Sequence, residues 1–504
     1  MSNDLWDKYK TWLYFNREAK FSLDISRIEF SESDFTNLES ALNKALVSME
    51  ELDNGAEANP DEGRMVGHYW LRDESKSPNN ELKKEIVNCK NKIKDFVNSI
   101  HTGKILSQSG ETFLNFIVVG IGGSALGPQL LEASLNPPCA KLKAYFLDNT
   151  DPDGIELTLE SIPNIDRTLV LVVSKSGGTK ETLNAQILTK EYFKKKEVDT
   201  SSCFVAVTGE GSKLDKAAVS ENWLERFPMW DWVGGRTSLW SAVGLLPAAL
   251  QGIPIDELLA GAKDMDALNR NKNLKENPAV LLAFSTFMTT NGKGEKAMVV
   301  LPYKDRLSLF SKYLQQLIME SLGKEKNLNG QVVNQGISVY GNKGSTDQHS
   351  YVQQLRSGLN NFFAVFIEVL KELSDIEVAE NVKAGDYLSG FYQGTRKALF
   401  DNNRESISIT IEELNAYSLG QMLALFERFV GIYACLINVN AYHQPGVEAG
   451  KKAAEAVIEK QNNILKVLKD AKNPLTVGEI VKLDSQLDAE TTFKILRHLA
   501  LNNR

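Results

Sequence analysis

The sequence predicts an α/β fold in which mostly parallel sheets are flanked by helices. Short apolar, β-branched runs alternate along the chain with segments whose apolar residues recur at helical spacing. Alternation of this kind is typical of βαβ units, whose strands are parallel and covered on both faces. The pattern occurs in two successive cycles, so two such sheets are expected. The strands predicted for the first cycle are 113–119, 142–147, 169–173 and 203–207, and the helices between them include 129–135 and 180–193.

The second cycle begins with a strand predicted at 297–301, followed by a helix at 306–322. The run 362–370 is a strand candidate, although a buried helix is possible from periodicity alone. Residues 411–439 are expected to be largely helical. Residues 445–460 carry a helix with proline near its first turn, where proline is well tolerated.

Changes of composition divide the 504 residues into four predicted segments. Residues 1–105 are polar and dense in helix formers, and we expect a helical extension that packs on the core. Residues 106–270 and 271–452 are the two α/β domains, which agrees with about 150 residues per domain. Residues 453–504 are charged and helical, and form a C-terminal extension.

Composition excludes several classes of partner. The chain has 57 Lys and Arg against 65 Asp and Glu, a net charge of −8, whereas nucleic acid and anionic membranes demand a basic face. Four cysteines without CxxC spacing are typical of a reduced, cytoplasmic protein. The start of the chain shows no secretory signal, and the apolar stretch 238–250 is shorter than the roughly 20 residues that cross a bilayer. We therefore expect a cytoplasmic protein with no nucleic-acid or membrane partner.

A glycine-rich loop, GIGGSALG at 120–127, follows the first predicted strand directly and opens a helix. Glycines let the backbone approach an anion, and the start of a helix offers free N–H groups. The same letters fit the dinucleotide fingerprint GxGxxA, with Asp148 at the end of the next strand. An NAD-dependent oxidoreductase is therefore one alternative, and a tight turn without a ligand is another.

A second loop, SKSGGT at 174–179, ends the third predicted strand in the same way. Its hydroxyls, its glycines and one lysine are groups that surround a phosphate. By itself such a loop is often only a turn. A dinucleotide needs only one such loop, whereas two neighbouring loops suit a compact phosphate ester. Together they favour a sugar phosphate.

Six separated motifs resemble the glucose-6-phosphate isomerase family, which is built from two sugar-isomerase (SIS) domains. Each motif is weak alone, but all six occur in the family's order between about residues 60 and 460. Two departures, the SKSGGT loop and Thr237 in place of an aromatic residue, are more typical of a bacterial or plastid branch than of a different activity. The motifs are GIGGSALGP (120–128), SKSGGTKET (174–182), GGRTSLWSAVGL (234–245), MESLGK (319–324), GSTDQHSYVQQL (344–355) and HQPGVEAGK (443–451).

The resemblance implies a role for each matched residue. Glu320 matches the base that moves a proton between C1 and C2, and Arg236 lies near the reacting carbons. His349 and Lys451 match the residues at the ring oxygen and the C1 hydroxyl. The implied substrate-binding residues are Gly123, Ser124, Ser174, Lys175, Ser176, Thr179, Gln316 and Gln444.

The resemblance also implies the reaction. D-Glucose 6-phosphate and D-fructose 6-phosphate would interconvert, in glycolysis and gluconeogenesis, by ring opening and proton transfer through a cis-enediolate. No step requires an organic cofactor, and no cluster of residues has metal-ligand spacing, so neither is expected. In the family the histidine segment reaches the neighbouring subunit, which implies a homodimer with shared active sites. The alternative is a non-catalytic sugar-phosphate sensor, which would be expected to lose the base Glu320.

Overall fold

The first cycle of strands forms a five-stranded sheet in which every pair of neighbours is parallel. The computed structural model describes residues 2–504, except for the side chains of residues 2–4 and 447–452. Every residue of the two neighbouring strands β3 and β5 is buried, which their nearly continuous apolar runs predict. In sheet order the strands are β4 (Lys143–Leu147), β3 (Asn115–Val119), β5 (Thr168–Val173), β6 (Phe204–Thr208) and β7 (Glu225–Pro228).

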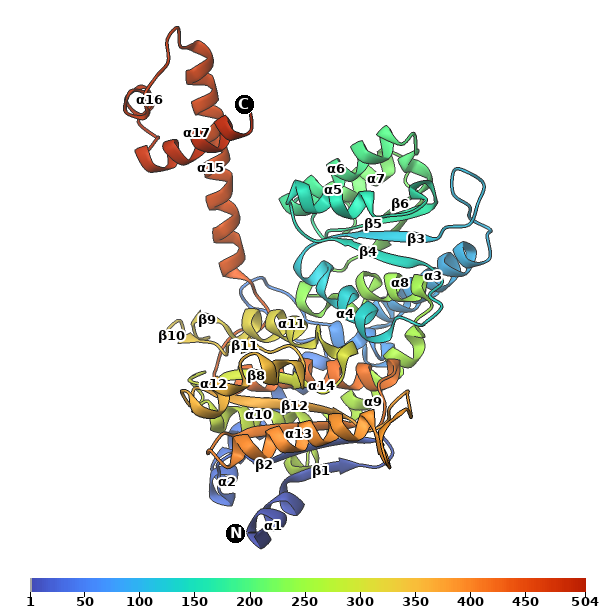
Figure 1. Ribbon diagram of the computed structural model, residues 1–504, viewed down its shortest axis with the longest axis vertical. Coiled ribbons are helices and arrows are strands. Elements are labelled where there is room, and N and C mark those ends of the chain that lie inside the picture. Colours follow the sequence, from blue (N-terminus) through green and yellow to red (C-terminus); the bar gives the residue numbers. More distant parts are fainter. Residues whose placement is uncertain (1) are drawn as a thin grey trace. The chain divides into compact units, whose positions relative to one another are not determined.

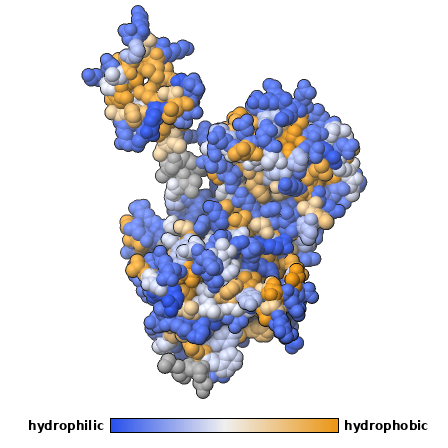
Figure 2. All heavy atoms as spheres, in the orientation of Figure 1, coloured by the Kyte–Doolittle hydropathy of each residue, from blue (hydrophilic) through white to orange (hydrophobic). Residues whose placement is uncertain are grey.

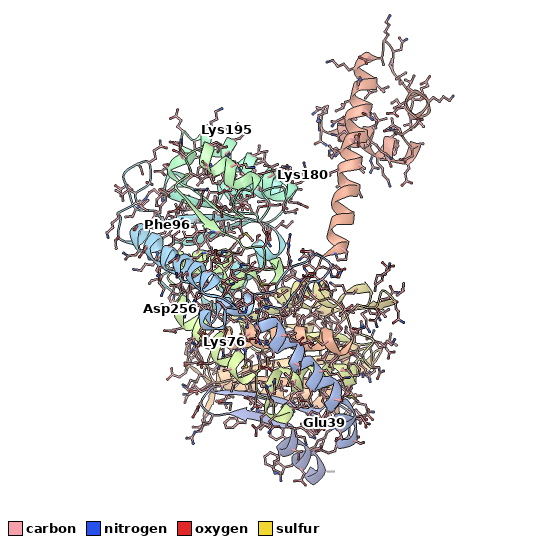
Figure 3. The ribbon with its side chains drawn as sticks, turned by 180° about the vertical axis from the view of Figure 1, so that it is seen from behind. Glu39, Lys76, Phe96, Lys180, Lys195 and Asp256 are labelled. Atoms are coloured by element: carbon pink, nitrogen blue, oxygen red, sulfur yellow. The ribbon has the colours of Figure 1, made fainter. Side chains whose placement is uncertain are left out.

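Helices cover both faces of this sheet (Figure 1). One face carries α5 (Pro152–Glu160), α6 (Lys180–Lys195) and α7 (Lys213–Ser220). The other face carries α3 (Asn80–His101), α4 (Leu126–Leu135) and α8 (Ala242–Gln251). Figure 3 shows the same arrangement from behind, with Lys180 and Lys195 marking the two ends of α6 and Phe96 lying on α3. The strands and helices predicted for the first cycle are confirmed.

The second cycle forms a six-stranded sheet. Its four strands from this half of the chain are parallel, and two strands from the N-terminal region complete it in antiparallel pairing. The predicted strands at 297–301 and 362–370 are confirmed. In sheet order the strands are β1 (Leu13–Asn16), β2 (Phe21–Arg27), β15 (Ser406–Ile411), β12 (Phe362–Val369), β8 (Ala297–Pro302) and β11 (Val339–Tyr340).

Alternate residues of β12 face two different cores. Phe363 and Val365 join the large core, which also contains α10 (Pro278–Thr289) and α14 (Ala416–Leu436). Phe366 belongs to a separate cluster, formed with α12 (Val352–Ser357) and α13 (Ala384–Phe400). The second sheet is therefore also covered on both faces, and the predicted α/β class is confirmed.

The sequence predicts a helical extension at 1–105, but this segment is only partly helical. Besides α1 (Ser2–Trp12), α2 (Glu32–Asp53) and α3, it contains the strands β1 and β2. Residues 23–26 of β2 are all buried, and Asp24 among them forms an ion pair with Arg396 of α13. The charge of Asp24 hid the strand in the sequence, because the ion pair that allows its burial joins residues far apart in the chain.

Helix α14 is the one helix in the described part of the chain that is long and apolar enough to cross a membrane. Its most apolar window is 89% buried inside the protein, which is typical of the core helix of a soluble protein. It crosses α9 (Ile255–Leu268) closely, because glycines lie at the crossing. A Cβ on Gly420 would lie 2.1 Å from the Leu258 carbonyl oxygen, and one on Gly261 would lie 1.9 Å from that of Tyr417.

His443–Arg504 forms a second compact unit, separate from Met1–Tyr442. It contains α15 (Pro445–Asp470), α16 (Val477–Leu483) and α17 (Ala489–Leu501), so the helix predicted at 445–460 is confirmed and continues further. Apolar side chains gather where these helices meet, and hydrophilic ones surround them (Figure 2). The predicted domain boundaries at 105, 270 and 452 remain predictions. The core residues of this unit are Ile464, Ile480, Leu487, Ile495 and Leu499.

The remaining elements are short. Two hairpins are formed by β9 (Lys324–Lys326) with β10 (Val332–Gln335) and by β13 (Glu377–Ala379) with β14 (Val382–Lys383). The short helices outside the site are η1 (His68–Leu71), η2 (Glu74–Lys76), η4 (Ile165–Arg167), η5 (Thr200–Ser202), η7 (Leu274–Glu276) and η8 (Asp305–Leu307).

Candidate active site

Both predicted phosphate loops lie at one edge of the first sheet. Because β3 and β5 are parallel neighbours, the residues that follow them emerge side by side. Gly120, directly after β3, packs closely against the end of β5, because an added Cβ would lie 3.2 Å from the carbonyl oxygen of Val173. Ligands of α/β proteins bind at this carboxyl edge of the strands. The edge is therefore a place where two anion-binding loops can act together.

The first loop also contacts the glycine-arginine motif. A Cβ on Gly123 would lie only 2.0 Å from the carbonyl oxygen of Gly235, so only glycine allows the two backbones to approach. The hydroxyl of Ser238 donates to the carbonyl oxygens of Gly123 (3.2 Å) and Gly235 (2.8 Å). These contacts join η3 (Gly122–Ser124) to η6 (Gly235–Trp240). Arg236 is thereby brought beside the first loop.

The second loop arranges its hydroxyls around the start of α6. The backbone N–H of Gly177 donates to Ser174 Oγ, and that of Gly178 donates to Ser176 Oγ, both at 3.1 Å. Each hydroxyl oxygen is thus fixed, and its own hydrogen can be donated to an anion. Thr179 is the N-terminal capping residue of α6 but uses no side-chain hydrogen bond to cap it. The positive end of the helix dipole adds to this anion-binding geometry.

Lys175 is directed elsewhere. Its ammonium group donates to the carbonyl oxygens of Asp231 (2.9 Å) and Val233 (3.2 Å) and lies 3.5 Å from the Asp231 carboxylate. Burial lowers the pKa of Lys175, and Asp231 partly offsets this effect. The lysine thus ties the second loop to the segment that follows β7. Its role as a phosphate ligand remains a prediction.

Arg236 and Glu320 lie together next to these loops. Arg236 is 5% exposed, and its Nη2 donates to the carbonyl oxygen of Ala441 at 2.8 Å. Its Nη1 lies 3.7 Å from Glu320 Oε1 and has no hydrogen-bond partner, although it is buried. Burial lowers the pKa of Arg236, and the charge of Glu320 opposes that shift. The result is a fixed guanidinium with one donor directed toward a carboxylate.

Glu320 ends a one-turn π-helix, η9 (Gln315–Glu320), which continues α11 (Phe310–Leu314). The predicted helix at 306–322 is therefore present but changes its geometry at this point. Wide turns of this kind are frequent at functional sites. The Gln316 amide nitrogen lies 3.1 Å from the position that a Cβ on Gly122 would occupy. The structure thus brings Gln316 and Arg236 against the first loop, with Glu320 beside Arg236.

Lys324 is a site residue that the sequence interpretation missed. Its ammonium group donates to the backbone carbonyl oxygen of Glu320 at 2.7 Å, and the residue is buried. Burial and, after it, the charge of Arg236 lower the pKa of Lys324 to about 8, against the opposing charges of Glu320 and Asp61. The signal was available, because Lys324 is the last letter of the MESLGK motif.

His349 lies on an exposed turn, at the end of η10 (Thr346–His349). The turn is held by Asp347, whose carboxylate accepts the backbone N–H groups of Asn342 (2.9 Å) and Lys343 (3.0 Å). Among the described residues, the His349 side chain takes part in no hydrogen bond or ion pair. The single chain therefore presents this histidine outward and does not show it in contact with Glu320.

The last two predicted site residues belong to the second unit. Gln444 is the N-terminal capping residue of α15. Lys451 follows in the same helix, and its side chain lies outside the described residues. Both roles remain predictions. Where side chains are described, no three His, Cys, Asp or Glu residues are grouped so that they could hold a metal ion.

The fold and the site together define an α/β protein of the sugar-isomerase type, with two loops rich in glycine and serine beside a buried arginine and a carboxylate. The family model for phosphoglucose isomerase matches residues 24–399 and 393–475. The glucose-6-phosphate isomerase of Geobacter sp. (strain M21) is 54% identical over 99% of this chain and 95% of its own length. That of Nostoc punctiforme is 53% identical over 99% and 96%. The chain belongs to the phosphoglucose isomerase family.

A solved structure has the same fold. The crystal structure of a glucose-6-phosphate isomerase from Chlamydia trachomatis D/UW-3/Cx superposes with a TM-score of 0.81 and covers 92% of both chains. Its sequence identity of 24% makes this a similarity of fold. The predicted family and architecture are thus confirmed by independent comparisons.

Proposed function

We propose that this chain interconverts D-glucose 6-phosphate and D-fructose 6-phosphate, with Glu320 as the base and Arg236 as the stabilising cation. The observation that carries these roles is the 3.7 Å approach of Arg236 Nη1 to Glu320 Oε1 beside the two loops. Membership of the phosphoglucose isomerase family and the 54% identity support the reaction itself.

The loops hold the phosphate and so place the sugar carbons. Ser174, Ser176 and Thr179 donate hydroxyl hydrogens to the phosphate, and the start of α6 contributes backbone N–H groups. Gly123 and Ser124 belong to η3, which follows β3 at the same edge, and we assign them to the same phosphate. Binding the phosphate at one end fixes the distance of C1 and C2 from Glu320.

The proton transfer needs one base and one cation. Glu320 removes the proton from one carbon and returns it to the neighbouring carbon, which a single carboxylate can do from one face. Negative charge then develops on the two oxygens of the cis-enediolate. Arg236 stabilises it with its unpaired Nη1 and retains its own proton throughout, as arginine does in proteins.

Ring opening is assigned to His349 and Lys451, with Gln444 binding the substrate. The outward position of His349 suits a site to which a neighbouring subunit contributes. We therefore include in the proposal a homodimer with shared active sites, located in the cytoplasm. The reaction places the enzyme in glycolysis and gluconeogenesis.

The alternatives have less support. No observation favours a non-catalytic sensor, because Glu320 and Arg236 are both retained and lie side by side. An NAD-dependent oxidoreductase uses the first loop but leaves the second loop and Glu320 without a role.

The first experiment measures turnover of fructose 6-phosphate in EDTA by coupled oxidation of the glucose 6-phosphate formed. We expect turnover, and we expect Glu320→Gln to lower kcat by at least about a hundredfold, the low end for loss of a general base. Glu325→Gln is the matched control, because Glu325 is an exposed carboxylate in the next strand. Full activity of Glu320→Gln would assign the base elsewhere, and phosphosugar binding without turnover in the wild type would favour the sensor.

A further inference from the structure

A fully buried polar network lies behind Arg236, and the proposed chemistry does not use it. We propose that Tyr313 and Glu427 are positioning residues that fix Arg236 for the reaction, so that its Nη1 remains available to the enediolate. This inference rests on the proposed function. It assigns a task to two residues that lie outside all six sequence motifs.

Glu427 is the centre of the network. It lies on α14 and is 2% exposed. Its carboxylate accepts Trp240 Nε1–H at 2.8 and 3.0 Å and the hydroxyl of Tyr313 at 3.2 Å. It also forms an ion pair with Arg72. With donors on both oxygens, this carboxylate has a single orientation.

Two of these donors lead directly to Arg236. Trp240 is the last residue of η6, the six-residue segment that carries Arg236. The hydroxyl of Tyr313 also lies 3.5 Å from the backbone carbonyl oxygen of Arg236. Glu427 therefore holds the segment at its end through Trp240 and, through Tyr313, next to the arginine itself.

Arg236 needs this support because its side chain is incompletely paired. Nη2 is held by the carbonyl oxygen of Ala441, but Nη1 is buried without a hydrogen-bond partner. A buried unpaired donor is unfavourable, so a mobile segment would turn until Nη1 found an acceptor. An anchored backbone prevents that rearrangement and keeps the donor directed toward the place where charge develops.

The charge of Glu427 is itself compensated. Arg72 also contacts Asp266 (2.9 Å), and Arg428 contacts Asp53 (3.2 Å) and Asp266 (3.5 Å). Breaking a buried pair by removing one partner is strongly destabilising. Removal of the Glu427 side chain would therefore destabilise the folded protein as a whole and not only the segment that carries Arg236. The hydroxyl of Tyr313 is the part of the network that can be removed cleanly.

The test compares Tyr313→Phe with wild type in the full-length enzyme. We expect kcat to fall by about tenfold with KM within about twofold, because the hydrogen bond acts on transition-state charge rather than on substrate binding. The matched control is Tyr433→Phe. Tyr433 lies on α14 and is buried, as Tyr313 is, and its hydroxyl forms a hydrogen bond with Thr290 Oγ1 at 2.9 Å. We expect its kcat to remain that of the wild type.

The same substitution in an Arg236→Lys background separates positioning from a general structural effect. If Tyr313 acts through Arg236, Tyr313→Phe should change the residual kcat of Arg236→Lys by less than about twofold. A tenfold loss in both backgrounds, or an unchanged kcat in the single variant, would overturn the proposal. Wild-type protein without turnover would instead contradict the proposed function, so the two failures are distinguishable.

A second variant covers the case in which Tyr313→Phe folds poorly. Trp240→Phe removes the indole N–H that donates to Glu427 and leaves the ion pair of Glu427 with Arg72 in place. We expect the same loss of kcat with KM preserved, and again no further loss in the Arg236→Lys background. Equal losses in both backgrounds would make the network merely structural and would overturn the proposal.

Discussion

His68 lies in the interior behind the site, where an ionised side chain without a partner of opposite charge is unfavourable. It is 1% exposed and lies against Tyr69, with ring centroids 3.9 Å apart. Neither ring nitrogen has a hydrogen-bond partner. Burial, followed by the positive charges of Arg72, Arg428 and Arg236, holds the pKa of His68 well below 6.5. The imidazole is therefore neutral in the folded protein at physiological pH.

The low pKa of His68 predicts that the folded protein loses stability in acid. Below pH 6.5 the histidine of the unfolded chain takes up a proton that the folded protein refuses, so stability is lost as pH falls. Above that pH both states are neutral and His68 has no effect. His68→Phe should remove this contribution. The unfolding free energy of the variant should therefore rise relative to that of the wild type by up to about 1.4 kcal/mol for each pH unit below 6.5.

Urea unfolding of wild type and His68→Phe at pH 8, 7, 6 and 5 measures this difference. The other titrating groups are common to both proteins and cancel. A difference that stays constant from pH 8 to pH 5 would show that His68 takes up a proton in the folded protein as readily as in the unfolded chain.

Sequence motifs predicted the residues at the front of the site better than those behind it. Arg236 and Glu320 are letters of the motifs, and Gln316 was predicted because it lies one helical turn before Glu320. Tyr313 and Glu427 were missed because their partners are far away in the chain, so nothing local marks them as buried and paired. The direction of Lys175 was equally hidden, since it depends on carbonyl groups that follow β7.

At the scale of elements, the contact between η3 and η6 sets the geometry of the site. The two short helices come from sequence positions more than a hundred residues apart, and they meet backbone to backbone at Gly123 and Gly235. A backbone atom cannot move aside as a flexible side chain can. The distance between the phosphate loop and Arg236 is therefore fixed by the absence of one Cβ.

Gly123→Ala should displace the two helices from each other. The new Cβ would lie 2.0 Å from the Gly235 carbonyl oxygen. We expect kcat/KM to fall by about a hundredfold, because misplacement by about 1 Å costs that much in catalysis. Gly478→Ala on α16 is the control, since a Cβ there meets no atom within 4 Å. It should leave activity unchanged, and wild-type kinetics in Gly123→Ala would refute the tight contact.

The sequence predicts strands well where both faces of the strand are buried. It predicts them poorly where a strand forms only because distant residues pair with it. The runs that became β3, β5 and β12 are apolar except for Asn115, Thr168 and Glu368, so they could be found without knowing their neighbours. Strand β2 carries a buried charge and belongs to a sheet formed mainly by the second half of the chain. The π-helix was also invisible, because the helical pattern of 306–322 does not reveal how the last turn is wound.

At the scale of the whole molecule, the exposed His349 and the proposed homodimer predict that inactive variants complement each other. Glu320→Gln and His349→Ala each disable every site when alone. In a mixed dimer with shared sites, one of the two sites receives an intact Glu320 and an intact His349 from different subunits. Random pairing of equal amounts should therefore restore about a quarter of the wild-type sites.

The experiment mixes the purified variants, allows subunits to exchange, and measures kcat per total chain. Subunit exchange is checked with two tags of different mass, and each variant alone serves as the control. Mixed dimers as inactive as their parents would show that His349 acts within its own chain or not at all.

The pairing of β2 with β15 has a consequence for the way the chain folds. Phe21 lies opposite Ile411, so about 390 residues separate two partners in one sheet. At about 5–20 residues per second, a ribosome makes that stretch in roughly 20–80 s. During this time β2 has no β15 to pair with, and such long-range pairing forms slowly. The newly made N-terminal strand is thus a part of this enzyme that needs protection from other chains during synthesis.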